Sequence, residues 1–256
     1  MQLIRTMLFY ALFYLSNAVQ MIFWTPAFFI VPREDAWKIV RLWALSHLWL
    51  QHLVCGSRYD FRGLDRIPTG SLLVASKHQS SWETYTMTLF FSDASFVLKR
   101  QLMHIPFFGW YVAKMKVVPV DRGKRSLALV SMTDSARRLL AKMDLQIIIY
   151  PEGTRRKAGA EPRYKYGITH LYLELSVPVV PVALNSGLYW GRHSPQIYPG
   201  TIVMKFLDPI APGLDKDAFS QTLQDTIETA TAELIGEAAR SSRPPPLALE
   251  LAGGSA

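Results

Sequence analysis

A histidine and a glutamate five residues apart are the strongest candidates for catalysis in this chain. His78 and Glu83 directly follow Ser71–Ser76, a run whose composition is typical of a β-strand. Ligands of α/β proteins bind at the carboxyl ends of the strands, where this histidine is expected. A carboxylate bonded to one imidazole nitrogen fixes the tautomer and leaves the other nitrogen as a base. The segment from Ser80 to Glu83 also fits a capping box, in which the glutamate only begins a helix. Both roles stay open at this point.

A cationic turn follows a second apolar run. The segment Tyr150–Lys157 comes after Leu145–Tyr150 and contains proline, glutamate, glycine, threonine and three basic residues. Cations, a hydroxyl group and a flexible glycine at the end of a strand are suited to hold a phosphate. A basic surface turn without any ligand would have the same composition.

Two further segments are unusual in composition. Lys99 and Arg100 precede the apolar and aromatic run Ile105–Trp110, a combination that suits an amphiphile with a charged head and an apolar tail. The alternative is a hydrophobic turn that packs under the sheet. The run Val177–Asn185 carries two prolines, which disfavour a central strand and predict an edge or rim position.

In order and spacing, these four segments resemble the glycerolipid acyltransferase family. That family has a histidine with an acidic residue five positions on, an apolar loop after a basic pair, an F-P-E-G-T-R-like block and a V-P-V-x-P-V-like block. The resemblance covers about residues 58–210, together with an N-terminal hydrophobic region of the usual kind. Two positions depart from the family pattern: Glu83 stands where aspartate is usual, and Tyr150 where phenylalanine is more frequent. Glycine loops for nucleotides, a G-x-S-x-G elbow and an H-E-x-x-H motif are absent from the sequence.

The resemblance implies transfer of an acyl chain to the sn-2 hydroxyl of 1-acyl-sn-glycerol 3-phosphate, which makes phosphatidic acid. Acyl-CoA or acyl carrier protein would be the donor, with no metal and no further cofactor. His78 would be the general base and Glu83 would orient it. The residues expected to bind the substrate are Glu152, Gly153, Thr154 and Arg155, with Lys99, Arg100 and Arg122 as further candidates.

Three other functions stay open. The acceptor could be another lysolipid, including a lyso-aminolipid without a phosphate. A thioester hydrolase could use the same histidine on water, although it would need neither a phosphate site nor a lipid anchor. A protein that only binds membranes or nucleic acid would use the basic middle of the chain, but it would have no use for the ordered motifs, so no nucleic-acid partner is expected.

The remaining elements predict an α/β fold, with a mostly parallel sheet flanked by helices on both faces. The expected strands are Ser71–Ser76, Ser95–Leu98, Lys116–Val120, Leu145–Tyr150, Val177–Leu184 and Thr201–Leu207. The expected helices are Lys124–Lys142, Tyr166–Leu175 and Asp215–Arg240, the last with Asp215 as its N-cap.

The N-terminus predicts a membrane anchor. Met7–Val31 contains no charged residue and, as a helix, would be about 37 Å long, enough to cross a hydrocarbon core of about 30 Å. Polar residues and Pro26 interrupt the run, so a spanning and a re-entrant helix both stay open, and a signal peptide is the main rival. The aromatic-rich stretch Ala36–Val54 suits an interfacial helix. Soluble acyl donors would place the catalytic domain on the cytoplasmic face of the inner membrane.

Composition agrees with a folded protein of this kind. The 256 residues are 50% hydrophobic and carry a net charge of +8, and Cys55 is the one cysteine. Residues 99–165 hold 15 basic against 5 acidic residues, which favours an anionic partner. The predicted organisation is therefore membrane-anchoring helices at 1–57, a catalytic domain at 58–240 and a disordered, proline-rich tail at 241–256.

Overall fold

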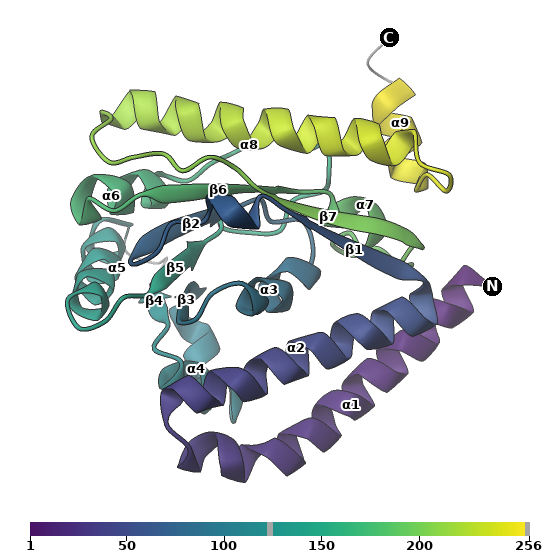
Figure 1. The fold of residues 1–256 in the computed structure, drawn as a ribbon, viewed down its shortest axis with the longest axis horizontal. Coiled ribbons are helices and arrows are strands. Elements are labelled where there is room, and N and C mark those ends of the chain that lie inside the picture. The colour runs from purple at the N-terminus through teal and green to yellow at the C-terminus, as the bar shows by residue number, and fades with distance from the viewer. Residues whose placement is uncertain (122–124, 254–256) are drawn as a thin grey trace.

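A single twisted sheet organises the molecule (Figure 1). The computed structural model describes residues 1–121 and 125–253, so the predicted phosphate ligand Arg122 lies outside the described residues. Within them, seven strands are ordered β1-β7-β6-β2-β5-β3-β4. Their bounds are β1 Ser57–Arg62, β2 Leu72–Ser76, β3 Ala94–Lys99, β4 Val118–Val120, β5 Gln146–Ile149, β6 Val179–Leu184 and β7 Gly200–Phe206. All neighbours are parallel except β6 and β7, which confirms the predicted mostly parallel sheet.

The central strands alternate between two hydrophobic cores. In β2, Leu72 and Val74 face one core, whereas Leu73 and Ala75 face the other. Ile147 and its neighbours in β5 divide in the same way. Strands buried on both faces need apolar residues at every position, which is why these runs show no apolar–polar alternation.

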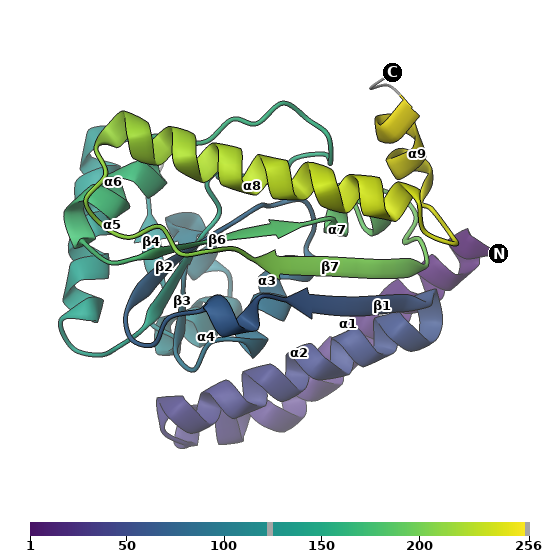
Figure 2. The ribbon, with the colours of Figure 1, turned by 45° about the horizontal axis from the view of Figure 1, so that its top comes forward.

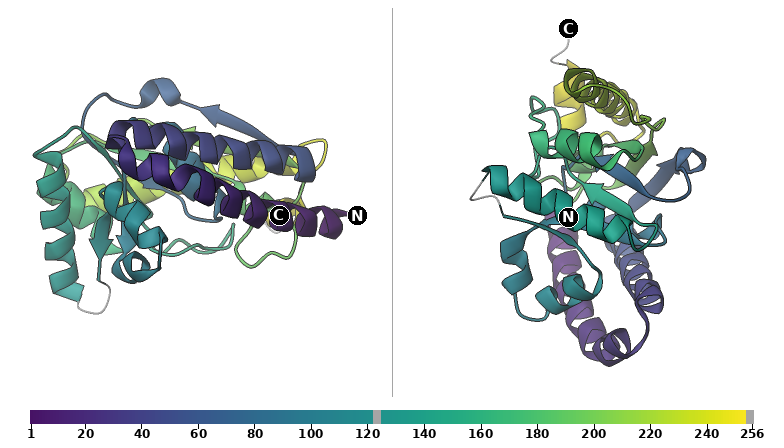
Figure 3. Two further views of the ribbon diagram at one scale, coloured as in Figure 1. Left: turned by 90° about the horizontal axis from the view of Figure 1, so that it is seen from below. Right: turned by 90° about the vertical axis from the view of Figure 1, so that its left-hand side faces the viewer.

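Helices cover both faces of the sheet (Figures 2 and 3). One core contains residues of α5 Arg125–Leu140, α6 Tyr166–Leu175 and α8 Lys216–Ala239. The other contains residues of α1 Gln2–Ile30, α2 Arg33–Cys55 and α3 Trp82–Thr86. The shorter helices are α4 Phe108–Lys114, α7 Ser186–Tyr189 and the 3-10 turns Leu64–Arg66, Met87–Leu89 and Arg100–His104.

The expected edge position of the proline-rich run is wrong. β6 lies inside the sheet between β7 and β2. Val179 exchanges backbone hydrogen bonds with Ile210, and β7 pairs with β6 only from Val182 onward. Pro181 therefore lies just past the end of the β7 ladder, where its carbonyl accepts from Leu207 and no N–H is required of it.

The predicted disordered tail also needs correction. Residues Pro246–Gly253 form helix α9, which packs against α8 and α7. Proline is well suited to the first turn of a helix, where its missing N–H costs nothing. Ala248 is fully buried, and a Cβ atom on Gly159 would lie 2.3 Å from a methyl carbon of Leu251. The tail folds because a glycine leaves room for its apolar side chains.

The two N-terminal helices form an antiparallel hairpin beneath the sheet (Figure 1). The polar residues of α1 face α2: Asn17 bonds to His47 at 3.1 Å and accepts from the Trp43 indole at 2.9 Å. Gln20 donates to Ser46 at 3.0 Å. The polar side chains that interrupt the apolar run therefore form hydrogen bonds inside the protein, and the outward face of α1 stays apolar.

The interfacial role expected of helix α2 stays a prediction, and one face of the helix packs on the sheet domain. Trp37, His47 and Leu48 are buried there, whereas Leu45 and Trp49 on the other face are exposed. Both helices share one core with the sheet, so the hairpin is continuous with the domain predicted to begin at residue 58.

Candidate active site

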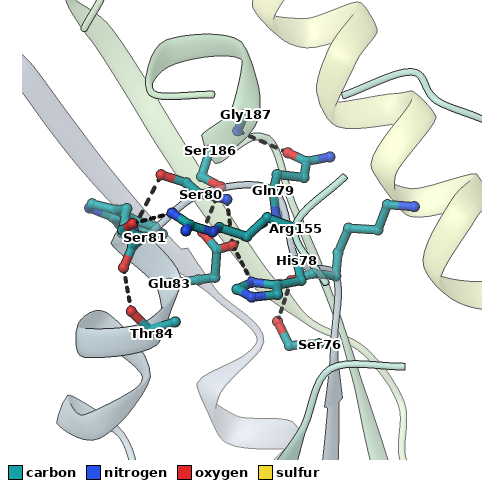
Figure 4. Close-up of polar contacts among 12 residues, drawn as sticks. Ser76, His78, Gln79, Ser80, Ser81, Glu83, Thr84, Arg155, Ser186 and Gly187 are labelled. Atoms are coloured by element: carbon teal, nitrogen blue, oxygen red, sulfur yellow. Dashed lines mark hydrogen bonds and ion pairs between the residues drawn. The ribbon is translucent and has the colours of Figure 1, made fainter. Parts of the chain in front are cut away.

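His78 and Glu83 meet at the carboxyl end of β2 (Figure 4). The imidazole Nδ1 lies 2.9 Å from Glu83 Oε1, and the histidine side chain is 13% exposed while the glutamate side chain is fully buried. His78 lies in the loop and Glu83 in the first turn of α3, which allows two residues five apart to face each other. A carboxylate can only accept hydrogen bonds, so Nδ1 carries the proton and the Nε2 lone pair is available as a base.

Glu83 is held from several sides. Its Oε1 accepts from the backbone N–H groups of Gln79 at 2.7 Å and Ser80 at 2.6 Å, and its Oε2 accepts from the Ser186 hydroxyl at 2.8 Å. The same carboxylate therefore accepts from the Ser80 N–H, as in one half of a capping box, and bonds to His78, so the geometry agrees with both readings of the motif. Ser186 comes from the turn after β6, and the sequence gives no signal for it beyond its position at a strand end.

A second residue of this loop is fixed by the same turn. Gln79 Oε1 accepts from the N–H of Gly187 at 2.9 Å. A Cβ atom at position 187 would lie 2.8 Å from the Cβ of Gln79, so only glycine allows this approach. The loop that carries His78 is thereby attached to the end of β6.

The tyrosine that opens the cationic turn forms one wall of the site. The Tyr150 ring stacks on the His78 imidazole, with centroids 4.0 Å apart and planes inclined by 19°. Burial, together with the nearby Glu83 carboxylate, raises the pKa of Tyr150 well above its ordinary value, so the phenol stays neutral. Within the described part of the chain its hydroxyl has no hydrogen-bond partner.

Glu152, one of the expected substrate ligands, is buried and paired with groups of the protein itself. Its side chain is fully buried, with Oε1 3.0 Å from Lys77 Nζ and Oε2 accepting from the His78 backbone N–H at 3.1 Å. Burial raises the pKa of Glu152, and the Lys77 ammonium partly offsets this. An acceptor-only group engaged in this way has nothing to offer a phosphate. Lys77, which also contacts Glu228 of α8 at 2.6 Å, was not predicted from the sequence.

The other residues of the cationic turn face the histidine loop. Arg155 Nη1 donates to the Ser81 hydroxyl at 2.5 Å, one residue from the helix that holds Glu83 (Figure 4). Gly153 has a φ of 66°, a left-handed conformation that closes the turn. Thr154 is exposed and accepts from Arg192 at 3.3 Å, and Arg192 also donates to the Arg155 carbonyl at 3.0 Å. Arg192, missed in the sequence, adds a second guanidinium to this turn.

The basic pair Lys99 and Arg100 lies farther away. Both are exposed at the end of β3, two strands from β2 at the same edge of the sheet. No contact among the described residues joins them to His78 or Arg155. Beside them, Ile105, Phe107, Phe108 and Trp110 are 42–61% exposed, so this run is a surface feature and not a turn packed under the sheet.

The geometry defines a class of enzyme. An imidazole base oriented by a buried carboxylate, near the half-buried Arg155 and the exposed Arg192, is equipped to deprotonate a hydroxyl group on a substrate that carries an anion. Comparison with protein-family models agrees with this class of enzyme. Residues 58–185 match the family model described as Acyltransferase. The chain belongs to this acyltransferase family.

Individual relatives show which enzymes of this family the chain is similar to. The chain is 40% identical over 205 residues to the 1-acyl-sn-glycerol-3-phosphate acyltransferase of Pseudomonas aeruginosa, a match that covers 78% of each chain. It is 29% identical over 178 residues to the 1-acyl-sn-glycerol-3-phosphate acyltransferase alpha of Mus musculus, covering 68% of this chain and 61% of the mouse protein. The crystal structure of the 1-acyl-sn-glycerophosphate (LPA) acyltransferase PlsC from Thermotoga maritima has the same fold, with a TM-score of 0.77, 23% identity, and coverage of 95% of this chain and 100% of that one.

Proposed function

We propose that this protein transfers an acyl chain from a thioester donor to the sn-2 hydroxyl of 1-acyl-sn-glycerol 3-phosphate, which makes phosphatidic acid. The observation that carries the proposal is the Nδ1–Oε1 contact of 2.9 Å between His78 and Glu83, with Arg155 beside it. The 40% identity to the Pseudomonas aeruginosa enzyme supports the same acceptor.

The reaction needs one base and no covalent enzyme intermediate. Nε2 of His78 takes the proton of the acceptor hydroxyl as its oxygen attacks the thioester carbonyl. The carbon–sulfur bond then breaks, and the leaving thiolate takes the proton back from the imidazolium. Glu83 stabilises the imidazolium between these steps. Base catalysis of this kind typically contributes about 10²–10⁴-fold in rate.

Arg155 and Thr154 are the residues we assign to the acceptor phosphate. An arginine beside an exposed hydroxyl can bind a phosphate through two parallel hydrogen bonds. Arg192 contacts both residues and is a further candidate for this role. Lys99 and Arg100 are more distant and would act on the same anion only through longer-range attraction.

The acceptor and the product are lipids, and helix α1 supports association with a membrane. It is the helix of the described chain that is long and apolar enough to cross a bilayer. Its outward residues are apolar and strongly exposed, including Ile4, Met7, Leu15, Ile22, Phe23 and Ile30. Since its polar residues bond to α2, this face can enter lipid without burying an unpaired polar group. Soluble donors would then reach the site from the cytoplasmic side.

The test is an assay of purified protein with labelled acyl-CoA and acyl carrier protein thioesters against a panel of lysolipids. We expect labelled phosphatidic acid with lysophosphatidic acid, and little product with lysolipids that lack a phosphate. Arg155→Ala should raise the KM for lysophosphatidic acid at least tenfold and leave the KM for the donor unchanged.

Two outcomes of this assay would contradict the proposal. Equal rates with a lyso-aminolipid acceptor would favour a different lysolipid acyltransferase. Release of free fatty acid at the same rate without any acceptor would show a thioester hydrolase.

A further inference from the structure

A cleft lies apart from the His78 site, and the proposed reaction does not use it. It has a volume of about 400 Å³, within the usual range for small-molecule sites. Its walls come from the end of α2, the starts of β1 and β7, and the loop between α8 and α9. His52, Arg58, Ser242 and Arg243 contribute its polar side chains, and no acidic residue lines it.

The charges in this cleft are not neutralised by the described part of the chain. Arg58 and Arg243 are exposed, and no hydrogen bond or ion pair to another described residue engages either guanidinium. Most surface arginines elsewhere do have such partners: Arg62 pairs with Asp60 and Glu237, and Arg137 with Glu174. Two unpaired guanidiniums beside a hydroxyl and an imidazole form a site for a polyanion, with phosphate as the best geometric match.

The sheet places this cleft at the same edge as His78. Strands β1 and β7 run opposite to β2 and β6, so the starts of the first pair lie at the edge where the second pair ends. Gly200, in the cleft wall, lies four residues beyond Met204, which pairs with Leu184 at the end of β6. The cleft is displaced from β2 by two to three strand spacings across the sheet and by four residues along β7. Together these displacements separate the cleft from His78 by about 15–20 Å.

This separation matches the acyl donor proposed above. In a coenzyme A thioester, thirteen bonds join the sulfur to the nearest phosphorus, and an extended chain of that length spans about 15 Å. The other phosphates of coenzyme A follow immediately. A thioester held at His78 is therefore long enough for its phosphates to reach Arg58 and Arg243.

We infer that this cleft binds the diphosphate and 3′-phosphate of an acyl-CoA donor while its thioester lies at His78. The inference rests on the proposed acyl transfer and selects coenzyme A over a carrier protein as the better-recognised donor. A carrier protein presents a single phosphodiester, which would leave most of the cleft empty.

Binding is tested first without turnover. Titration of the detergent-solubilised full-length protein with 3′,5′-ADP should show saturable binding, weakened at least tenfold in Arg58→Ala and in Arg243→Ala. Arg66→Ala is the matched control, because this exposed arginine follows the far end of β1 and does not line the cleft. Equal binding by all four proteins, or none by the wild type, would overturn the inference.

Kinetics then separate the donor from the acceptor. Both cleft variants should raise the KM for acyl-CoA at least tenfold, with kcat within twofold and the KM for lysophosphatidic acid unchanged. A smaller effect is expected when acyl carrier protein is the donor. A rise in the KM for lysophosphatidic acid alone would assign the cleft to the acceptor and overturn the inference. If the wild type binds 3′,5′-ADP through these arginines but transfers no acyl chain, the proposed function fails while the polyanion site stands.

Discussion

Glu83 performs two tasks that usually fall to different residues. It begins helix α3 by accepting from the backbone of Ser80, and it holds the Nδ1 proton of His78. The longer side chain is tolerated because Gln79 and Ser186 bond to the same carboxylate and fix its position. The glutamate at this position is therefore held in one orientation toward His78.

Replacing Glu83 by glutamine should separate the charge from the structure. The amide oxygen can take the place of Oε1, and the amide nitrogen would face the Ser186 hydroxyl, which can accept. We expect Glu83→Gln to lower kcat by about 10²-fold, since the imidazolium loses its counter-charge. The melting temperature should stay within a few degrees of the wild type. A kcat within twofold would show that the Glu83 carboxylate only caps the helix.

Tyr150 stands where phenylalanine is more frequent in the family, and a substitution can test the effect of its hydroxyl group. Its ring stacks on His78, but its hydroxyl is buried without a partner among the described residues. Removing an unsatisfied buried hydroxyl relieves a desolvation cost, so Tyr150→Phe should be neutral or should stabilise the fold by about 1 kcal/mol. Activity should be unchanged. A large loss of kcat in Tyr150→Phe would instead show that the phenol contacts the substrate.

At the scale of elements, the sequence predicted best where one local pattern decides the structure. Helix α6 begins and ends where the sequence placed it, and Asp215 caps α8 by accepting from Asp217 and Ala218. The prediction failed where tertiary contacts override composition, as for the prolines of β6 and the tail. Strand β1 was also missed, although Tyr59 and Phe61 alternate with polar residues. Its strand partner among the described residues, β7, is about 140 residues away in the chain.

In the candidate site, too, the sequence could place residues that depend on local structure but not residues that depend on tertiary contacts. The motif placed His78 and Glu83 together, because their contact depends on a loop and a single helical turn. It could not place Ser186 or Arg192, which reach the site through the ends of other strands. The motif also gave no sign that Glu152 is buried against Lys77, because the two residues lie in different motifs.

Helix α9 gives a prediction at the same scale. Leu251 packs over Gly159, while Leu249 on the same helix is 53% exposed. Leu251→Asp would place a charge in the apolar contact over Gly159 and should destabilise the protein by about 1–3 kcal/mol, which lowers the melting temperature by several degrees. Leu249→Asp is the matched control and should leave it unchanged. Equal melting temperatures for both variants would contradict the docking of α9.

At the scale of the whole molecule, the exposed aromatic loop adds to the apolar surface of helix α1. Lys114 donates to the carbonyls of Phe29 at 3.2 Å and Val31 at 2.6 Å, which ties α4 to the turn between α1 and α2. The exposed run Ile105–Trp110 therefore lies beside the end of α1. We expect both to enter the same bilayer, with the loop acting as a second contact beside the anchor.

A spin label can test this arrangement. Cys55 is buried, which raises the pKa of its thiol to about 12, so at pH 7–8 it stays protonated and unreactive. A cysteine introduced by Phe107→Cys can then be labelled selectively. In vesicles its label should be accessible to oxygen and protected from a water-soluble nickel complex. A label at Tyr166→Cys, on exposed α6, is the control and should show the reverse. Equal access at both sites would place the aromatic loop in water.

The central claim is that His78 Nε2 removes the proton from the lipid hydroxyl. Its most direct test is the rate of phosphatidic acid formation by His78→Ala at saturating acyl-CoA and lysophosphatidic acid. We predict a kcat lower by about 10²–10⁴-fold than that of the wild type, with an unchanged melting temperature. A kcat within tenfold of the wild type, in protein of unchanged stability, would contradict the account.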